Sequence, residues 1–218
     1  MIPSKGWERA VHPRDWAAMT RMHESSHVTA SEALGIPVTD VWANVDRSVT
    51  HGGQYRNGAG DSQLQSVVYL IGAEGGAQEL RERGYDEHLA HGSTLACGYN
   101  DREIVRNVVV PEAASAGYRL DPDIAYDNAL QILHSPGFRD ASHNVAQALA
   151  DRGDRLVGAD VRAAMGDFQL DGSLWLPTSA ELNPPDHEVP GYVAPALSAT
   201  PADQMPSQEQ DFDEDIDL

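Results

Sequence analysis

The segment His23-Glu24-Ser25-Ser26-His27 restricts the folding of this chain more than any other feature of the sequence. Two histidines four residues apart share one face only if the backbone between them is α-helical. On such a face both imidazoles can bind one ion, and zinc binds imidazole nitrogens at about 2.0–2.1 Å. Glu24 follows the first ligand, where its carboxylate can take a proton from a water molecule on the ion. The sequence therefore predicts a helical zinc site with Glu24 as the general base.

A helix over residues 15–34 accommodates this motif. Asp15 is a good N-cap, Gly35 suits the position after the helix, and Pro37 prevents its continuation. Residues 38–55 are rich in Val, Thr, Trp and Tyr, so they predict one or two short strands.

The rest of the domain is predicted to be largely helical. Asp61 would cap a long helix, Pro111 would end a shorter one, and residues 85–99 are predicted to form a loop. The expected helices cover residues 62–83, 100–109, 122–133, 139–152 and 159–167. The fold class is therefore mainly α with a small β element near the start.

Charge is unevenly distributed along the 218 residues, whose net charge is −19. From Pro177 to the C-terminus there are ten acidic residues and no Lys or Arg. We therefore expect an N-terminal extension over residues 1–14, a zinc-binding domain over 15–176, and a disordered, acidic, Pro-containing tail over 177–218. The apolar residues between the last acids of this tail also suit a short segment that docks on a partner protein.

The composition excludes several classes of protein. An acidic surface repels phosphate backbones, so nucleic acid is not an expected partner. No run of residues approaches the roughly 20 apolar residues that span a bilayer, and the N-terminus has no apolar signal-peptide segment. The single cysteine, Cys97, excludes an internal disulfide and fits a reducing compartment. We expect a cytoplasmic protein with no membrane partner.

The HExxH motif supplies two zinc ligands, and a third must come from another part of the chain. Asp101 precedes the apolar residues Ile104, Val105 and Val108, which can pack a short helix against the core. His51, beside two glycines, is predicted to be a turn or strand residue. The candidates for the third ligand are Asp86, Glu87, His88, His91, Asp101 and Glu103. Spacing alone does not choose among them.

Three segments resemble the FtsH-type (M41) zinc peptidase family. They are MHESSHVTASEALG, similar to that family's zinc helix, YLIGAEGGAQEL, similar to its second helix, and GSTLACGYNDREIVRNVV, similar to the segment that carries an Asn-Asp pair. The resemblance covers roughly residues 15–168 and implies that Asp101 is the third ligand. The chain departs from the family at Ser25-Ser26, where Ala-Gly is usual, and at Gln78, where Glu is usual.

The resemblance implies a Zn²⁺-dependent endopeptidase whose substrates are proteins or peptides. The 218 residues contain no GxxxxGK[ST] sequence, so we expect a stand-alone peptidase domain without an ATPase motor. Such an enzyme would hydrolyse flexible or unfolded segments. The alternative is a non-catalytic or regulatory adaptor that keeps the zinc fold. Glu24 argues against a pure scaffold, because a scaffold does not need a general base.

Overall fold

The computed structural model describes residues 10–46 and 53–183, without the side chains of residues 94–97. The helices are α2 (Pro13–Ala33), α3 (Ser62–Glu82), α4 (Glu87–Cys97), α5 (Tyr99–Ile104), α6 (Val110–Ser115), α7 (Pro122–Leu133), α8 (Phe138–Asp151), α9 (Gly158–Met165) and α10 (Ser179–Leu182), with a π-helical turn, η1 (Val105–Val109), between α5 and α6. The strands β1 (Val38–Ala43), β2 (Gly53–Asn57) and β3 (Arg155–Val157) form one antiparallel sheet in the order β2-β1-β3. The prediction of a mainly helical fold with a small β element is confirmed.

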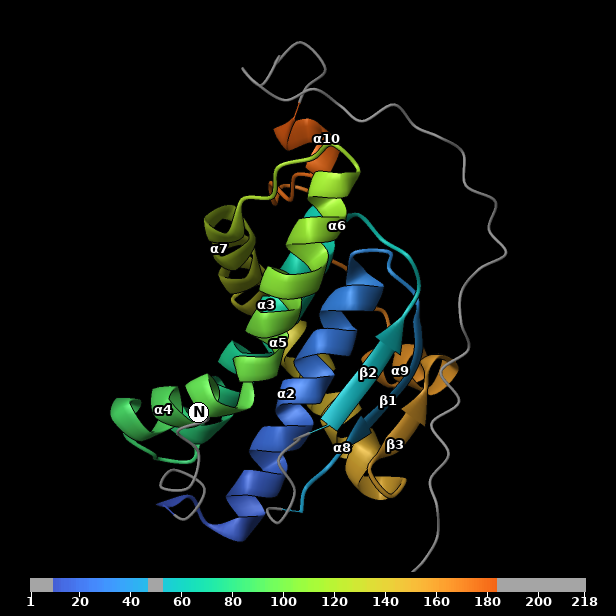
Figure 1. Cartoon of the computed structure of the whole chain (residues 1–218). Coiled ribbons are helices and arrows are strands. Elements are labelled where there is room, and N and C mark those ends of the chain that lie inside the picture. Colours follow the sequence, from blue (N-terminus) through green and yellow to red (C-terminus); the bar gives the residue numbers. More distant parts are fainter. Residues whose placement is uncertain (1–9, 47–52, 184–218) are drawn as a thin grey trace, which may run out of the picture. The chain divides into compact units, whose positions relative to one another are not determined.

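Helix α2 lies between the sheet and α3 (Figure 1). On the sheet side, Val28 packs in one buried cluster with Val41 of β1 and Leu156 of β3. On the other side, Ala30 packs with Ile71 of α3 and with residues of α7. Because α2 has apolar partners on both sides, nearly every residue of its second half is buried. The histidines of the motif are therefore buried by position rather than by their own hydrophobicity.

Glycines of α3 bring its backbone close to α2. A Cβ atom at Gly75 would overlap the hydroxyl of Ser26, and one at Gly76 would stand 3.3 Å from Cγ of Met19. Ser26 instead donates its hydroxyl hydrogen bond to the carbonyl of Met22 at 2.8 Å within its own helix. Small residues on both helices thus set the short separation between them. This packing explains why a small residue, Ser26, occupies that position of the motif.

The packed unit begins earlier and ends later than the sequence predicted. Helix α2 starts at Pro13 with His12 as its N-cap, and Val11 is buried in the core. Pro suits the first helical position because its missing N–H would be unsatisfied there in any residue. At the other end, the backbone N–H of Ser179 donates to Oδ1 of Asp61 at 2.9 Å, so the described unit extends past Leu176 to Asn183. Residues 184–218 and His51 lie outside the described part of the chain.

The loop prediction for residues 85–99 is wrong, because α4 occupies most of this segment. Oδ1 of Asp86 accepts a hydrogen bond from the N–H of Leu89 at 2.8 Å, as an N-cap does. Ala90 is buried and Leu89 partly buried in the cluster that also contains Leu80 of α3. The contacts of Leu89 and Ala90 with the core therefore hold α4 in place, although its sequence shows no long apolar stripe.

Pro111 does not end the helix that follows Asp101. The N–H of Val110 donates to the carbonyl of Val105, five residues back, and α6 then starts a new hydrogen-bond ladder with Pro111 in its first turn. The wider π turn also shifts the buried face, so that Val109 is 2% exposed while Val108 is 45% exposed. The expectation that Val108 packs against the core is therefore wrong.

None of the described helices is long and apolar enough to cross a membrane. The third strand, β3, was not predicted, because three residues are too few to show an alternating pattern.

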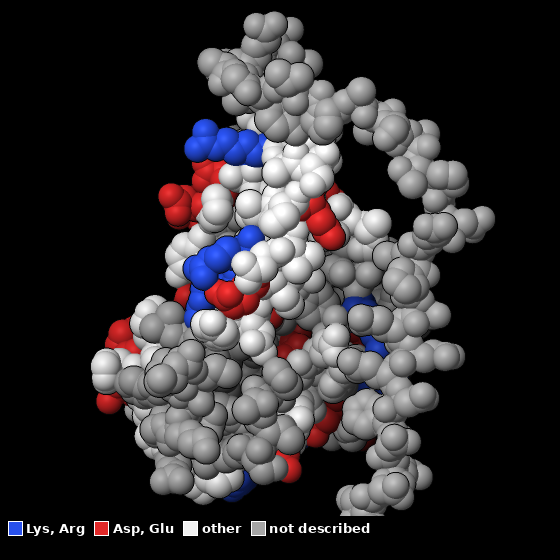
Figure 2. All heavy atoms as spheres, viewed as in Figure 1, with Lys and Arg blue, Asp and Glu red and all other residues white. Residues whose placement is uncertain are grey.

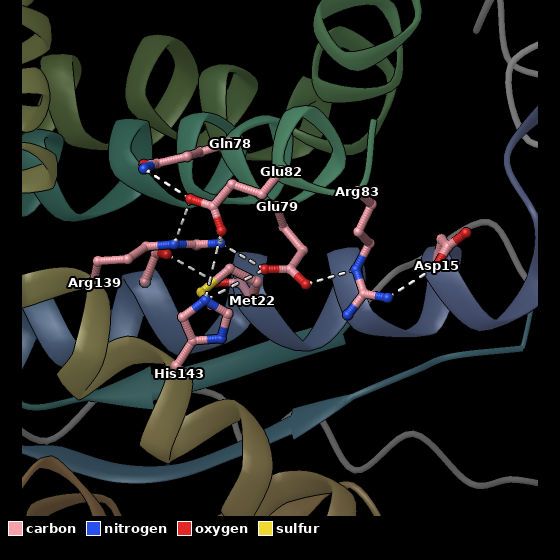
Figure 3. Close-up of polar contacts among 9 residues, drawn as sticks. Asp15, Met22, Gln78, Glu79, Glu82, Arg83, Arg139 and His143 are labelled. Atoms are coloured by element: carbon pink, nitrogen blue, oxygen red, sulfur yellow. Dashed lines mark hydrogen bonds and ion pairs between the residues drawn. The ribbon is translucent and has the colours of Figure 1, made fainter. Parts of the chain in front are cut away.

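A network of ion pairs joins α2, α3 and α8 (Figure 3). Glu79 is its centre, with a side chain that is 5% exposed. One of its carboxylate oxygens accepts from Nη2 of Arg139 at 2.6 Å, and the other accepts from Nε of Arg83 at 2.7 Å. The same two arginines bind Glu82 and Asp15, respectively. A buried carboxylate with two guanidinium partners holds the three helices together.

We expect Glu79→Gln to lower the free energy of unfolding by about 1–3 kcal/mol, because Arg139 and Arg83 would each lose a charge-assisted hydrogen bond and keep only the more exposed Glu82 and Asp15 as charged partners. Urea unfolding followed by circular dichroism measures this change. Glu87→Gln is the matched control, since Glu87 pairs with Arg81 at 2.6 Å on the open surface and should change stability far less. Equal changes in the two variants would contradict the central role of Glu79.

Candidate metal centre

Three side chains from two helices converge beside α3. Nε2 of His23 lies 3.0 Å from Nε2 of His27, and both belong to α2. Oδ2 of Asp101, from the first turn of α5, lies 3.1 Å from Nε2 of His23 and 3.5 Å from Nε2 of His27. The sequence predicted these three residues as ligands, and the fold brings them together although 74 residues separate His27 from Asp101.

The spacing of these atoms fits one metal ion. Donors held by a tetrahedral zinc at about 2.0–2.1 Å stand about 3.3 Å apart. The three observed distances, 3.0, 3.1 and 3.5 Å, lie on both sides of that value. The chemistry of the set, two imidazole nitrogens and one carboxylate oxygen, is one that zinc accepts in catalytic sites, where a fourth position is left for water.

A contact with α3 fixes the orientation of His27. Its Nδ1 lies 2.6 Å from the carbonyl oxygen of Val68, which requires Nδ1–H to be the donor. In the neutral ring the unprotonated nitrogen is then Nε2, which faces the other two donors. Such an outer hydrogen bond commonly sets the tautomer and ring position of a metal-binding histidine. The ring of Tyr55 stacks on the other side, with centroids 4.8 Å apart and planes 27° apart.

Gly72 gives the His27 ring its space. A Cβ atom at this position would lie less than 3.0 Å from three atoms of the imidazole. Alanine is ordinarily the better helix former by about 1 kcal/mol, so the clash rather than helix propensity decides the outcome here. The sequence showed a small-residue segment in α3, but it did not show which glycine faces the metal ligand.

We expect Gly72→Ala to displace His27 and to weaken zinc binding, with a loss of about 1–3 kcal/mol in stability from overpacking. Metal titration and urea unfolding measure the two effects. Gly172→Ala is the control, because a Cβ atom at Gly172 meets nothing within 4 Å. Unchanged zinc affinity in Gly72→Ala would mean that the ring can relax without leaving the site.

Glu24 is buried next to the two histidines, 3% exposed. Burial raises the pKa of its carboxyl group, and the neighbouring imidazoles oppose that rise. The start of β2 lies directly against it, since a Cβ atom at Gly53 would stand 2.5 Å from Oε1 of Glu24. The Glu24 carboxylate thus has a fixed position between the zinc helix and the sheet.

The electrostatics of the site favour a bound cation. Burial alone would raise the pKa of Asp101, but His27 and His23 hold it well below its usual range. Burial alone would lower the pKa of His27, and Asp101 reverses this, so that the pKa is raised. Both pKa shifts have the same cause: the Asp101 carboxylate stabilises positive charge between the three side chains.

The other candidate ligands lie elsewhere. His88 and His91 are exposed on α4, where the sequence predicted a loop. Glu87 pairs with Arg81, and Glu103 pairs with Arg106 at 2.6 Å. In the described residues one further set of possible ligands converges, namely Glu79, Glu82 and His143. Arg139 pairs with both of its carboxylates and Arg83 with Glu79, so this set belongs to the ion-pair network.

Asp101 and Glu24 border a cleft of about 460 Å³. The cleft is lined by Glu24, Trp42, Asn44, Gly53, Gln54, Tyr55, Tyr69, Asn100, Asp101 and Ile104. Several of these residues belong to β1, β2 and α5. On the face drawn in Figure 2, basic and acidic side chains are interspersed on the described surface. Sequence reasoning missed Tyr55 and Tyr69 as site residues. Only their positions in the fold distinguish them from core aromatics.

Comparisons with known proteins add no relative to this description. No protein-family model matches the chain, and no curated protein matches it. The resemblance to FtsH-type peptidases therefore rests on the three sequence segments alone.

Proposed function

We propose that this protein is a zinc-dependent endopeptidase that hydrolyses flexible or unfolded protein segments without an ATPase motor. One observation carries the proposal: Nε2 of His23, Nε2 of His27 and Oδ2 of Asp101 lie 3.0–3.5 Å from one another, and Asp101 lines a cleft together with Glu24. The resemblance to the FtsH-type family supports the same reading.

The roles of the residues follow from their positions. His23, His27 and Asp101 would hold the ion, which when bound polarises a carbonyl group and lowers the pKa of a water molecule to about 7. Glu24 would take a proton from that water and pass it to the leaving amine, as a positioned carboxylate does in general acid–base catalysis. Its raised pKa suits a group that must both accept and return a proton.

The cleft suits an extended peptide. Within the described residues β2 pairs with β1 on one side only, and its Gly53, Gln54 and Tyr55 line the cleft. An open strand edge offers main-chain N–H and C=O groups to another extended chain. A segment bound in this way must be free of its own secondary structure. Flexible or unfolded proteins are therefore the substrate class that the cleft favours.

Elemental analysis and a cleavage assay test this proposal together. We expect about one zinc per chain in the purified wild-type protein, far less in His23→Ala, and cleavage of unfolded casein by the wild type alone. Equal zinc in both proteins would contradict the ligand assignment. Stoichiometric zinc without cleavage of any unfolded substrate would favour the alternative, a non-catalytic or regulatory adaptor that keeps the zinc fold.

A further inference from the structure

Two tyrosines that the proposed mechanism does not use lie at the metal centre. Tyr55 from β2 and Tyr69 from α3 both line the cleft, with ring centroids 5.7 Å apart. Both residues are half-buried, but the hydroxyl oxygen of Tyr55 is itself buried, with no hydrogen-bond partner among the described residues. Tyr69 is therefore the member of the pair that a bound peptide can reach.

The position of Tyr69 relative to Glu24 is the second observation. Glu24 lies against Gly53 on the sheet side of the centre. Tyr69 packs against Val109 and Ala113, beside Ile104, and so belongs to the wall that α5, η1 and α6 form. A carbonyl bound between these walls would have the base near one side and a phenol near the other.

The surrounding structure holds the phenol in its protonated form. Burial raises the pKa of Tyr69, and the neighbouring hydroxyl of Tyr55 opposes this only in part. Tyr69 also follows Val68, whose carbonyl binds His27, so α3 positions the phenol and the metal ligand together.

We propose that Tyr69 is a catalytic residue that donates a hydrogen bond to the oxygen of the scissile carbonyl, and that Tyr55 positions it. The inference rests on the proposed peptidase function. When water adds to the carbonyl carbon, the C=O electron pair moves to the oxygen, which then accepts the hydrogen bond while Tyr69 keeps its proton. Return of that pair breaks the C–N bond, and the amine leaves with the proton that Glu24 took from the water.

The amide side chains in the cleft are less suited to this role. Gln54 and Asn100 are exposed at its rim, and Oδ1 of Asn44 accepts from the N–H of Asp46 at 3.2 Å. Tyr69 is anchored on a long helix next to the metal ligands. A donor that is already oriented before the reaction gains most from a developing negative charge.

Steady-state kinetics of the zinc-loaded full chain with a fluorogenic unstructured peptide tests the proposal. We expect Tyr69→Phe to lower kcat/KM by about 10–100-fold, mostly through kcat, with zinc content unchanged; a single lost oxyanion donor costs on the order of 10²–10³ where no metal shares the charge. A phosphonamidate peptide, which mimics the tetrahedral state, should bind more weakly by a similar factor. Tyr55→Phe should keep zinc, because the ring still stacks on His27, and should lose less activity.

Tyr126→Phe is the matched control, since its hydroxyl donates to Glu74 at 3.0 Å outside the cleft lining. It should behave as the wild type. A purely structural role of Tyr69 predicts no loss of kcat in Tyr69→Phe, because the ring is retained, and that result would overturn the inference alone. A wild type that binds zinc and cleaves no peptide would overturn the proposed function, and the inference with it.

Discussion

Glu24→Gln should keep its zinc and its fold while the rate of cleavage falls by about 10²–10⁴-fold, the usual contribution of general acid–base catalysis. Glutamine has nearly the same shape, so the contact with Gly53 survives. It cannot accept a proton at neutral pH. Initial rates on unfolded casein, with zinc content and circular dichroism of the same samples, measure the three quantities.

Glu74→Gln serves as the control for this substitution. Glu74 lies on α3 and accepts a hydrogen bond from Tyr126, which glutamine also can accept, and it does not line the cleft. Its rate should equal that of the wild type. If Glu24→Gln cleaved as fast as Glu74→Gln, Glu24 would not be the base, and the buried carboxylate would need another explanation.

Asp101→Ala should lose zinc affinity by more than the 10–100-fold that is typical of removing an outer-shell partner, because it removes a direct ligand. The fold should persist, since Val105 and Val109 still pack the same helical segment against the core. His88→Ala and His91→Ala should bind zinc as the wild type does, because both histidines are exposed on α4, outside the converging set.

Zinc titration of these three variants, with thermal unfolding of the metal-free proteins, distinguishes the assignments. Normal affinity in Asp101→Ala together with a loss in either histidine variant would move the third ligand to α4. That outcome would also remove the basis for the FtsH-type interpretation, since the family's Asn-Asp pair falls on Asn100 and Asp101 in this chain.

Local interactions made part of this protein predictable from sequence. The four-residue spacing of His23 and His27 places them on one helical face in any packing environment. The Asp61 cap and the Asp121-Pro122 start are satisfied within a few residues, and both helices begin where the sequence indicates. These features depend on backbone geometry and on short hydrogen bonds, which a single sequence displays directly.

The tertiary structure decided what depends on distant segments. The residue pattern left Asp101 as one of six candidates for the third ligand. Asp101 reaches the histidines because α3 contacts both α2 and α5. Tyr55, Gly72 and Tyr69 gain their positions in the same way, from contacts across tens of residues. Helix α4 exists because the core offers Leu89 and Ala90 a surface. The sequence by itself determined a helix with His23 and His27 on one face. The packing of other elements around that helix brought Asp101 to the two histidines and formed the walls of the cleft, because close contacts between distant segments have no local pattern.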